Sequence, residues 1–171
     1  MSDVPVRGGL SLWRRLTELY ARILSVLVVT TLAILLVPVT MQIFSRFTHI
    51  IPHYIWTEEL ARFLFIWSIM LGATLAVREG SHLVVDIWPK LSPRTDAALR
   101  LITSLAILIV ALVFVWAGYE FTAFAWHRIS ELAEMPLWII HIAWPVAGVS
   151  WIIFLGEQFY DDLRILAGRT P

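Results

Sequence analysis

The chain has no cysteine among its 171 residues, and few of its residues carry a charge. The lack of cysteine excludes disulfide bridges, thiolate zinc sites, CxxC redox chemistry and covalent attachment of c-type haem. Charged residues make up 15%, against about 25% in ordinary soluble domains, whereas hydrophobic residues make up 59%. A soluble fold of this composition would expose large apolar patches, so a soluble globular enzyme is excluded.

An excess of charge of either sign is also missing, because Lys and Arg together number 13 and so do Asp and Glu. Without a basic excess the chain has no signature of nucleic-acid binding. A chain this poor in charge and rich in aromatic residues is also the opposite of a disordered segment. The sequence contains no nucleophile–base pair, glycine-rich phosphate loop or HExxH motif, so we expect no catalysis, no metal and no cofactor.

What the sequence does contain is four long runs with few or no Asp, Glu, Lys and Arg residues. A membrane-spanning helix needs about 20 mostly apolar residues, and the second run reaches this length only if it begins near Trp56 and includes Glu58, Glu59 and Arg62. The runs predict an all-α integral membrane protein with four transmembrane helices in a single domain, residues 1–171. The spans are expected at about residues 23–45, 56–77, 98–119 and 136–157, with an amphipathic cytoplasmic loop over residues 78–97.

The Lys and Arg residues divide unevenly between the two sides of the predicted membrane. Ten lie in the N-terminal segment, the loop between the second and third helices and the C-terminal tail, whereas three lie on the other side. Because short loops rich in Lys and Arg stay in the cytoplasm, both termini are expected there. The first, third and fourth helices have no charged residue in their central portions. Pumps and exchangers place such groups at mid-membrane, so this chain is poorly equipped to move an ion by itself.

The charged residues of the second helix lie at its start. Glu58 and Arg62 have the (i, i+4) spacing that lets two side chains pair on one face of a helix. One interpretation is a solvated helix start, with acids near the positive end of the helix dipole. The other is a protein-facing surface, because small residues at four-residue spacing on the same face let another helix approach closely. The sequence leaves open whether that helix is internal or from another subunit. The face comprises Glu58, Arg62, Phe65, Ile69, Gly72, Ala76 and Gly80.

The loop after the second helix mixes apolar and polar residues in short steps. It is interpreted as an amphipathic segment at the membrane surface, with Trp88 at the level of the lipid headgroups. His82 and Asp86 have a spacing that permits a hydrogen bond, but two ligands are too few for zinc. Gly80 is typical of a helix end and Ser92-Pro93 of a helix start.

A haem site is the alternative from another functional class. His127 and His141 are expected near the outer ends of the third and fourth helices, where a bis-His b-type site is conceivable. Histidines are common where membrane helices end, and no second pair supports electron transfer across the membrane. The alternative function is therefore a haem-binding membrane anchor subunit of a respiratory enzyme.

The chain resembles the small membrane subunit of tripartite ATP-independent periplasmic (TRAP) transporters, the DctQ family. The resemblance starts with an acidic pair and an arginine, Glu58-Glu59-x-x-Arg62, and continues through Trp67, Gly72, Ala76, Arg78, Gly80, His82 and Asp86. Two later segments resemble the start and the interior of the family's fourth helix, namely Met135-Pro136-Leu137-Trp138 and Trp144-Pro145-Val146-Ala147-Gly148. A glycine directly two residues after the proline is replaced here by Ala147-Gly148, which is a minor departure.

The resemblance implies a scaffold role and no enzymatic activity. Its implied partners are a large DctM-type membrane subunit, a periplasmic DctP-type substrate-binding protein and membrane lipids, in sodium-coupled uptake of an organic acid across the bacterial inner membrane. The resemblance assigns to the large-subunit interface Glu58, Glu59, Arg62, Trp67, Gly72 and Ala76. It assigns to the cytoplasmic turn and to lipid contact Arg78, Gly80, His82, Asp86 and Trp88.

Overall fold

The computed structural model describes residues 8–48, 52, 54–79 and 93–166, and within these ranges the chain is almost entirely helical. Its helices are α1 (Gly8–Thr48), α2 (Trp56–Glu79), α3 (Pro93–Ala125), α4 (Trp138–His141) and α5 (Ala143–Leu166). Four helical stretches are long and apolar enough to cross a membrane: Leu12–Thr48, Trp56–Glu79, Ala98–Ala125 and Trp138–Leu163. The predicted all-α fold with four membrane-spanning helices is therefore confirmed.

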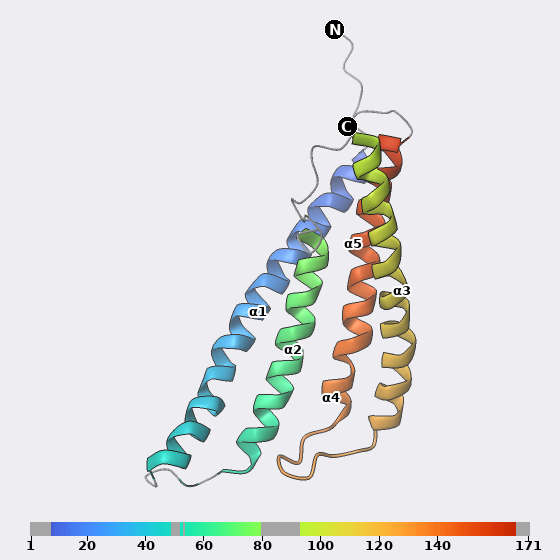
Figure 1. Ribbon diagram of the computed structural model, residues 1–171. Helices are drawn as coiled ribbons and strands as arrows, with labels where there is room; N and C mark the ends of the chain where they lie inside the picture. The colour runs from blue at the N-terminus through green and yellow to red at the C-terminus, as the bar shows by residue number, and fades with distance from the viewer. Residues whose placement is uncertain (1–7, 49–51, 53, 80–92, 167–171) are drawn as a thin grey trace.

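The long helices form two pairs that lie side by side (Figure 1). Helix α1 pairs with α2, α3 pairs with α5, and the contact between α2 and α5 joins the pairs. We call the end of the bundle where α1 begins and α5 ends the near end, and the opposite end the far end. Helix α1 approaches α5 at the near end and leans away from it toward the far end (Figure 1).

Helices α3 and α5 pack closely because glycine stands at two of their contacts. A Cβ atom added at Gly118 would lie 2.6 Å from Cδ of Pro145, and one added at Gly148 would lie 2.7 Å from the carbonyl oxygen of Ala111. Small residues let helix backbones come this near in a membrane, where no hydrophobic effect drives helices together. The two glycines therefore fix the α3–α5 pair.

The α1–α2 pair is held along one seam. The shielded side chains of α1 recur at alternating steps of three and four, as in a coiled coil, and comprise Leu24, Val28, Thr31, Leu35, Pro38, Gln42 and Ser45. Midway along the seam the hydroxyl of Ser68 donates to Oγ1 of Thr31 at 3.1 Å. The rest of this part of α1 faces outward, and the side chains of Val29 and Leu36 are 68% and 66% exposed. One stripe of α1 therefore packs on α2, and the remainder is left for lipid or a partner.

The helices are longer than the predicted spans. Helix α3 begins at Pro93, as the Ser92-Pro93 start signal predicts, and α1 begins at Gly8 rather than near residue 23. The 41 residues of α1 measure about 60 Å, twice the roughly 30 Å of the hydrocarbon core. The fourth span is divided at Ile142, three residues before Pro145, whose missing N–H weakens the helix there.

Candidate partner-binding face

Helix α2 has one face that the other described residues of the chain leave uncovered. Its opposite side is buried against α1 and α5 through residues such as Leu71 and Thr74. On the uncovered side, Phe65 and Ile69 are 54% and 46% exposed, and the charged residues Glu58 and Arg62 are exposed as well. The structure thus brings the charged and the large apolar residues of the predicted stripe to the surface of the bundle. A helix placed on this stripe would bury aromatic and aliphatic side chains.

Gly72 lies at the middle of this face, and the space around it is open. A Cβ atom built on Gly72 would have no neighbouring atom within 4 Å, in contrast to Gly118 and Gly148. Ala76, one turn further along, is half-buried. Packing within the described part of the chain therefore gives no reason for a glycine at position 72. Its small size is what close approach of a further helix requires.

Trp67 is half-buried and its indole points toward α4. Its indole Nε1–H donates to the carbonyl oxygen of Ile139 at 3.0 Å, and its ring packs beside Met70 and Leu71. Buried tryptophan usually finds such an acceptor for its N–H group. The structure places Trp67 where it ties α2 to α4, and its assignment to the subunit interface stays a prediction.

Glu59 turns away from the exposed face and toward the loop that joins α3 to α4. The residue is only 7% exposed, and its Oε2 atom accepts hydrogen bonds from the hydroxyl of Ser130 and the N–H of Ala133, both at 2.6 Å. The N–H of Leu132 donates to the same oxygen at 3.3 Å. Glu134, next to this contact, has the left-handed backbone angle φ 52°. The Glu59 carboxylate therefore orders the far-end loop of its own chain.

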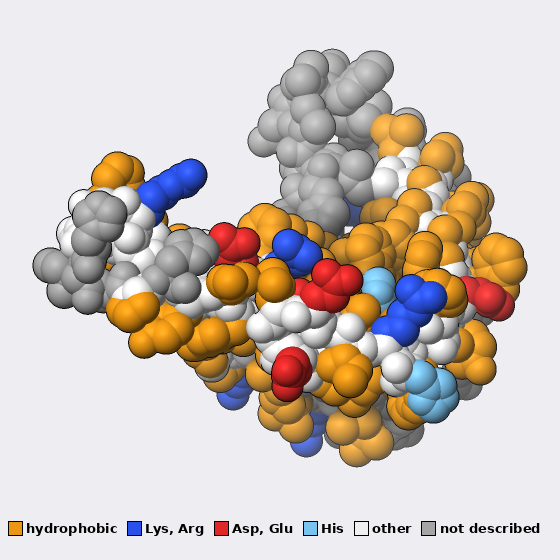
Figure 2. All heavy atoms as spheres, turned by 90° about the horizontal axis from the view of Figure 1, so that it is seen from below, with side chains coloured by type: hydrophobic (Ala, Val, Ile, Leu, Met, Phe, Trp, Pro, Cys, Tyr) orange, Lys and Arg blue, Asp and Glu red, His pale blue; other side chains and the backbone are white. Residues whose placement is uncertain are grey.

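The far end as a whole presents both signs of charge. Figure 2 shows acidic and basic side chains spread among hydrophobic ones over this end, without a single patch of one sign. Around the loop, Glu131 and Arg128 are exposed, and the guanidinium of Arg128 lies 3.9 Å from the centre of the Phe124 ring. The far end thus has exposed acidic and basic side chains beside exposed hydrophobic ones.

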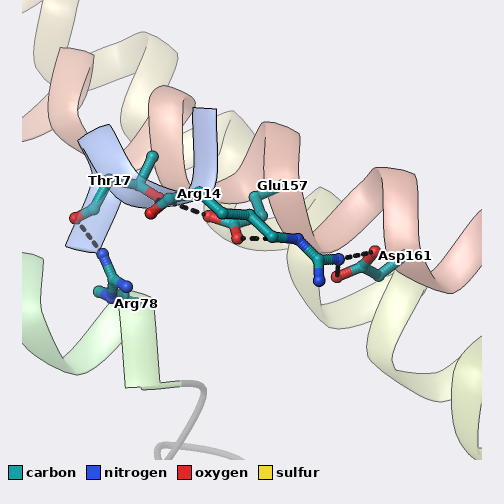
Figure 3. A network of polar contacts seen from close by, with 5 residues as sticks. All are labelled: Arg14, Thr17, Arg78, Glu157 and Asp161. Carbon is teal, nitrogen blue, oxygen red and sulfur yellow. Dashed lines mark hydrogen bonds and ion pairs between the residues drawn. The ribbon is translucent and has the colours of Figure 1, made fainter. Parts of the chain in front are cut away.

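Polar contacts also join three helices at the near end (Figure 3). The guanidinium of Arg14 on α1 binds both carboxylate oxygens of Asp161 on α5, at 2.7 and 2.9 Å, and its Nε lies 3.7 Å from Glu157. The Oγ1 atom of Thr17 lies 3.0 Å from Oε2 of Glu157. Arg78, at the end of α2, donates to the backbone carbonyl of Thr17. We call Arg14, Thr17, Arg78, Glu157 and Asp161 the near-end clamp.

Several predicted residues belong to neither group. Gly80, His82, Asp86 and Trp88 lie outside the described residues, so their assignment to the turn stays a prediction. His127 is exposed, and His141 stacks on Phe121 with ring centroids 5.9 Å apart. Within the described ranges, no group of three or more His, Asp or Glu side chains is placed to hold a metal ion.

A pattern in the sequence indicates the near-end clamp, but it becomes visible only when the first and last spans are compared with each other. Glu157 and Asp161 are four residues apart and therefore share a helix face, as Arg14 and Thr17 do at three residues apart. Both pairs lie near the ends of the first and fourth apolar stretches that meet at the near end of the bundle. Opposite charges at matching depths thus predict a contact between the first and last helices. The partners of Glu59 had no such signal, because they come from an irregular loop.

A multi-pass helical membrane protein with an uncovered helix face is the class that these features define. The family model for the DctQ component of tripartite ATP-independent periplasmic transporters matches residues 35–165, and the chain belongs to this family. The family is a transporter subunit and not an enzyme, and the haem-anchor alternative receives no support from it.

Three relatives illustrate the match. The chain is 26% identical to the sialic acid TRAP transporter small permease protein SiaQ of Vibrio cholerae, over 91% of this chain and 90% of that protein. It is 28% identical to a putative TRAP transporter small permease protein of Haemophilus influenzae, over 80% of this chain and 84% of that protein. It is also 28% identical to the isethionate TRAP transporter permease protein DctMQ of Oleidesulfovibrio alaskensis, over 81% of this chain but only 23% of that protein.

Proposed function

We propose that the chain is the fixed scaffold for a large DctM-type membrane subunit and binds it through the uncovered face of α2. In this function the complex takes up an organic acid together with sodium ions, and a periplasmic DctP-type binding protein delivers the acid. The observation that carries the proposal is a stripe on α2 that combines the exposed side chains of Phe65 and Ile69 with the small, half-buried residues Gly72 and Ala76, on a helix whose other side is buried.

The DctMQ relative supports association with a larger membrane protein. Most of this chain matches less than a quarter of that permease, so the matching segment there belongs to a much longer polypeptide. A segment fused to a larger permease in one protein is expected to lie against the corresponding large subunit where the two are separate chains. This expectation agrees with the lack of charged residues in the centres of the first, third and fourth spans.

The two ends of the bundle have different roles in this proposal. The near end is placed in the cytoplasm and the inner membrane is the location, because ten of the thirteen Lys and Arg residues flank the spans on that side. The far end then faces the periplasm, where the loop held by Glu59 is available to the delivery protein. Lipid contacts the remaining apolar surface of α1 and α3.

The glycines of the chain provide a matched test of the binding face. Gly72→Leu fills the open stripe on α2, whereas Gly156→Leu adds the same side chain to an exposed position of α5 that also has no atom within 4 Å. Both variants are expected to fold. Affinity purification of the tagged chain, co-expressed with the large subunit, should recover the large subunit with wild type and Gly156→Leu and lose most of it with Gly72→Leu. Equal recovery with both variants would contradict the assignment of the face.

Transport itself is tested with the purified subunits. Large and small subunits are reconstituted in liposomes, and radiolabelled organic acids are supplied with the periplasmic binding protein under a sodium gradient. Uptake is expected only when this chain, the large subunit and the gradient are all present. Uptake by this chain alone would contradict its proposed role as a scaffold, and uptake without the gradient would contradict the proposed coupling to sodium.

A further inference from the structure

The near-end clamp joins α1 to α5 at the end of the bundle where these two helices meet. Helix α1 contacts α5 through residues from Arg14 to Leu24, with the hydroxyls of Tyr20 and Ser150 2.6 Å apart and Leu24 packed near Phe154. Beyond this stretch α1 leans away and follows α2 (Figure 1). The clamp therefore lies at the base of a long helix whose other end is held by one seam.

The near-end clamp consists of hydrogen bonds and ion pairs, which are directional and therefore restrict how α1 lies against α2 and α5. One guanidinium nitrogen of Arg14, Nη2, donates to both carboxylate oxygens of Asp161, and this charge-assisted contact ties α1 to α5. Thr17 is 3% exposed and connects Glu157 of α5 to Arg78 of α2. The Arg78 guanidinium also lies 5.4 Å from the centre of the Phe154 ring on α5. Three helices thus meet through groups whose orientations depend on one another.

We propose that the near-end clamp is a positioning device that sets the angle of α1 against α5 and so places the α1–α2 pair for assembly with the large subunit. The proposal rests on the proposed function for its purpose, but the angle is a property of this chain alone. From Arg14 to Phe47, at the far end of α1, the helix runs about 50 Å. A small change of angle at the clamp therefore becomes a large displacement at the far end.

The absence of cysteine makes this angle measurable in the full chain. Phe47→Cys on α1 and Phe124→Cys on α3 introduce two label sites at side chains that are 78% and 64% exposed. Pulsed electron–electron resonance on the doubly nitroxide-labelled chain in lipid nanodiscs then reports the far-end separation. Neither label site belongs to the clamp, so loss of a purely local contact would leave the distance unchanged.

Four versions of the labelled chain are compared. Wild type and Arg15→Ala, which removes the same charge from the adjacent exposed position, are expected to give one narrow distance. Arg14→Ala is expected to give a second, separate distance component. The exchanged pair Arg14→Glu with Asp161→Arg, made together with Glu157→Gln so that no carboxylate of α5 opposes the new one on α1, should restore the single distance, because opposite charges again face each other between α1 and α5. An unchanged distance in Arg14→Ala, or no restoration in the exchanged pair, would overturn the proposal.

Recovery of the large subunit with the same variants tests the purpose of the clamp. Arg14→Ala should reduce recovery and the exchanged pair should restore it, in parallel with the distances. A shifted distance with full recovery would overturn the role in assembly. Absence of binding even by wild type would instead contradict the proposed function and leave the measured angle as the test of the clamp.

Discussion

Glu58 and Glu59 are neighbours in the sequence, and the fold gives them opposite surroundings. Successive residues of a helix point about 100° apart, so one carboxylate faces outward while the other reaches the α3–α4 loop. Both are acidic residues in the first turn of α2, where the helix dipole favours negative charge. The tertiary positions of Ser130 and Ala133 determine the surroundings of Glu59, because these residues supply hydrogen-bond donors to its carboxylate.

Removal of the Glu59 carboxylate should loosen the far-end loop. Glu59→Ala leaves the N–H groups of Leu132 and Ala133 and the hydroxyl of Ser130 without this acceptor, so amide exchange in residues 130–133 should become about tenfold faster or more. Glu59→Gln keeps one oxygen acceptor and should fall between. Hydrogen–deuterium exchange by mass spectrometry in nanodiscs measures the effect.

The matched control for this prediction is Glu58→Ala, which removes the same charge from the exposed neighbour. Its exchange in the loop should equal that of wild type. If Glu59→Ala left the loop protected, the bridge between Ile129 and Pro136 and the Ser130 N–H bond to Met135 would suffice to order it.

At the scale of the helices, the lack of charged residues predicts where the chain crosses the membrane but not where each helix ends. An uncharged run marks the part of a helix within hydrocarbon, and a helix continues into the headgroup region as long as its backbone hydrogen bonds are satisfied. Arg14, Arg15 and Arg22 therefore interrupt the apolar run without ending α1. Residues typical of helix starts predict helix ends more accurately than uncharged runs do, since Ser92-Pro93 predicts the start of α3 to the residue.

The contact between α3 and α5 predicts opposite effects for two glycines of α5. Gly148→Ala places a Cβ 2.7 Å from the Ala111 carbonyl oxygen and 2.9 Å from Val115 Cγ2, so the helices must separate. This overpacking should cost about 1–3 kcal/mol. Gly156→Ala meets no atom and gains helix propensity, so it should be neutral or stabilising by up to about 1 kcal/mol.

Equilibrium unfolding by SDS in mixed micelles, followed by tryptophan fluorescence, compares the two variants with wild type. A Gly148→Ala variant as stable as Gly156→Ala would show that α3 and α5 have room to move apart. The sequence alone ranks these positions equally, because it shows a glycine in each case and not the backbone that lies opposite.

At the scale of the whole molecule, the two helix pairs are joined by a contact between α2 and α5 that is polar at its centre and apolar around it. The indole Nε1–H of Trp151 donates to the hydroxyl oxygen of Thr74 at 3.1 Å, and both residues are buried. The Thr74 hydroxyl in turn donates to the carbonyl of Met70. Near them, Met70 packs against Ala143 and Ala147. The position of the proposed binding face relative to α5 therefore depends on these contacts, together with the packing of Leu71 and Val77 against α5.

A double-mutant cycle measures how much the hydrogen bond between Trp151 and Thr74 contributes to the packing of the two helix pairs against each other. Trp151→Phe removes the donor and leaves a small cavity, whereas Thr74→Val removes the acceptor and keeps the volume close to that of threonine. The two changes together should cost less than the sum of the single changes, with a coupling of about 1 kcal/mol. Trp116→Phe, at a side chain that is 71% exposed, is the control and should leave the free energy of unfolding unchanged.

The outcome separates two explanations of how the bundle holds together. A coupling near 1 kcal/mol means that a buried hydrogen bond fixes the register between α2 and α5, as expected where polar groups have no water to bind. Strictly additive free energies would mean that the apolar contacts of Met70 with Ala143 and Ala147 suffice. In that case Trp151→Phe would destabilise the chain only through the cavity, and Thr74→Val would be close to neutral.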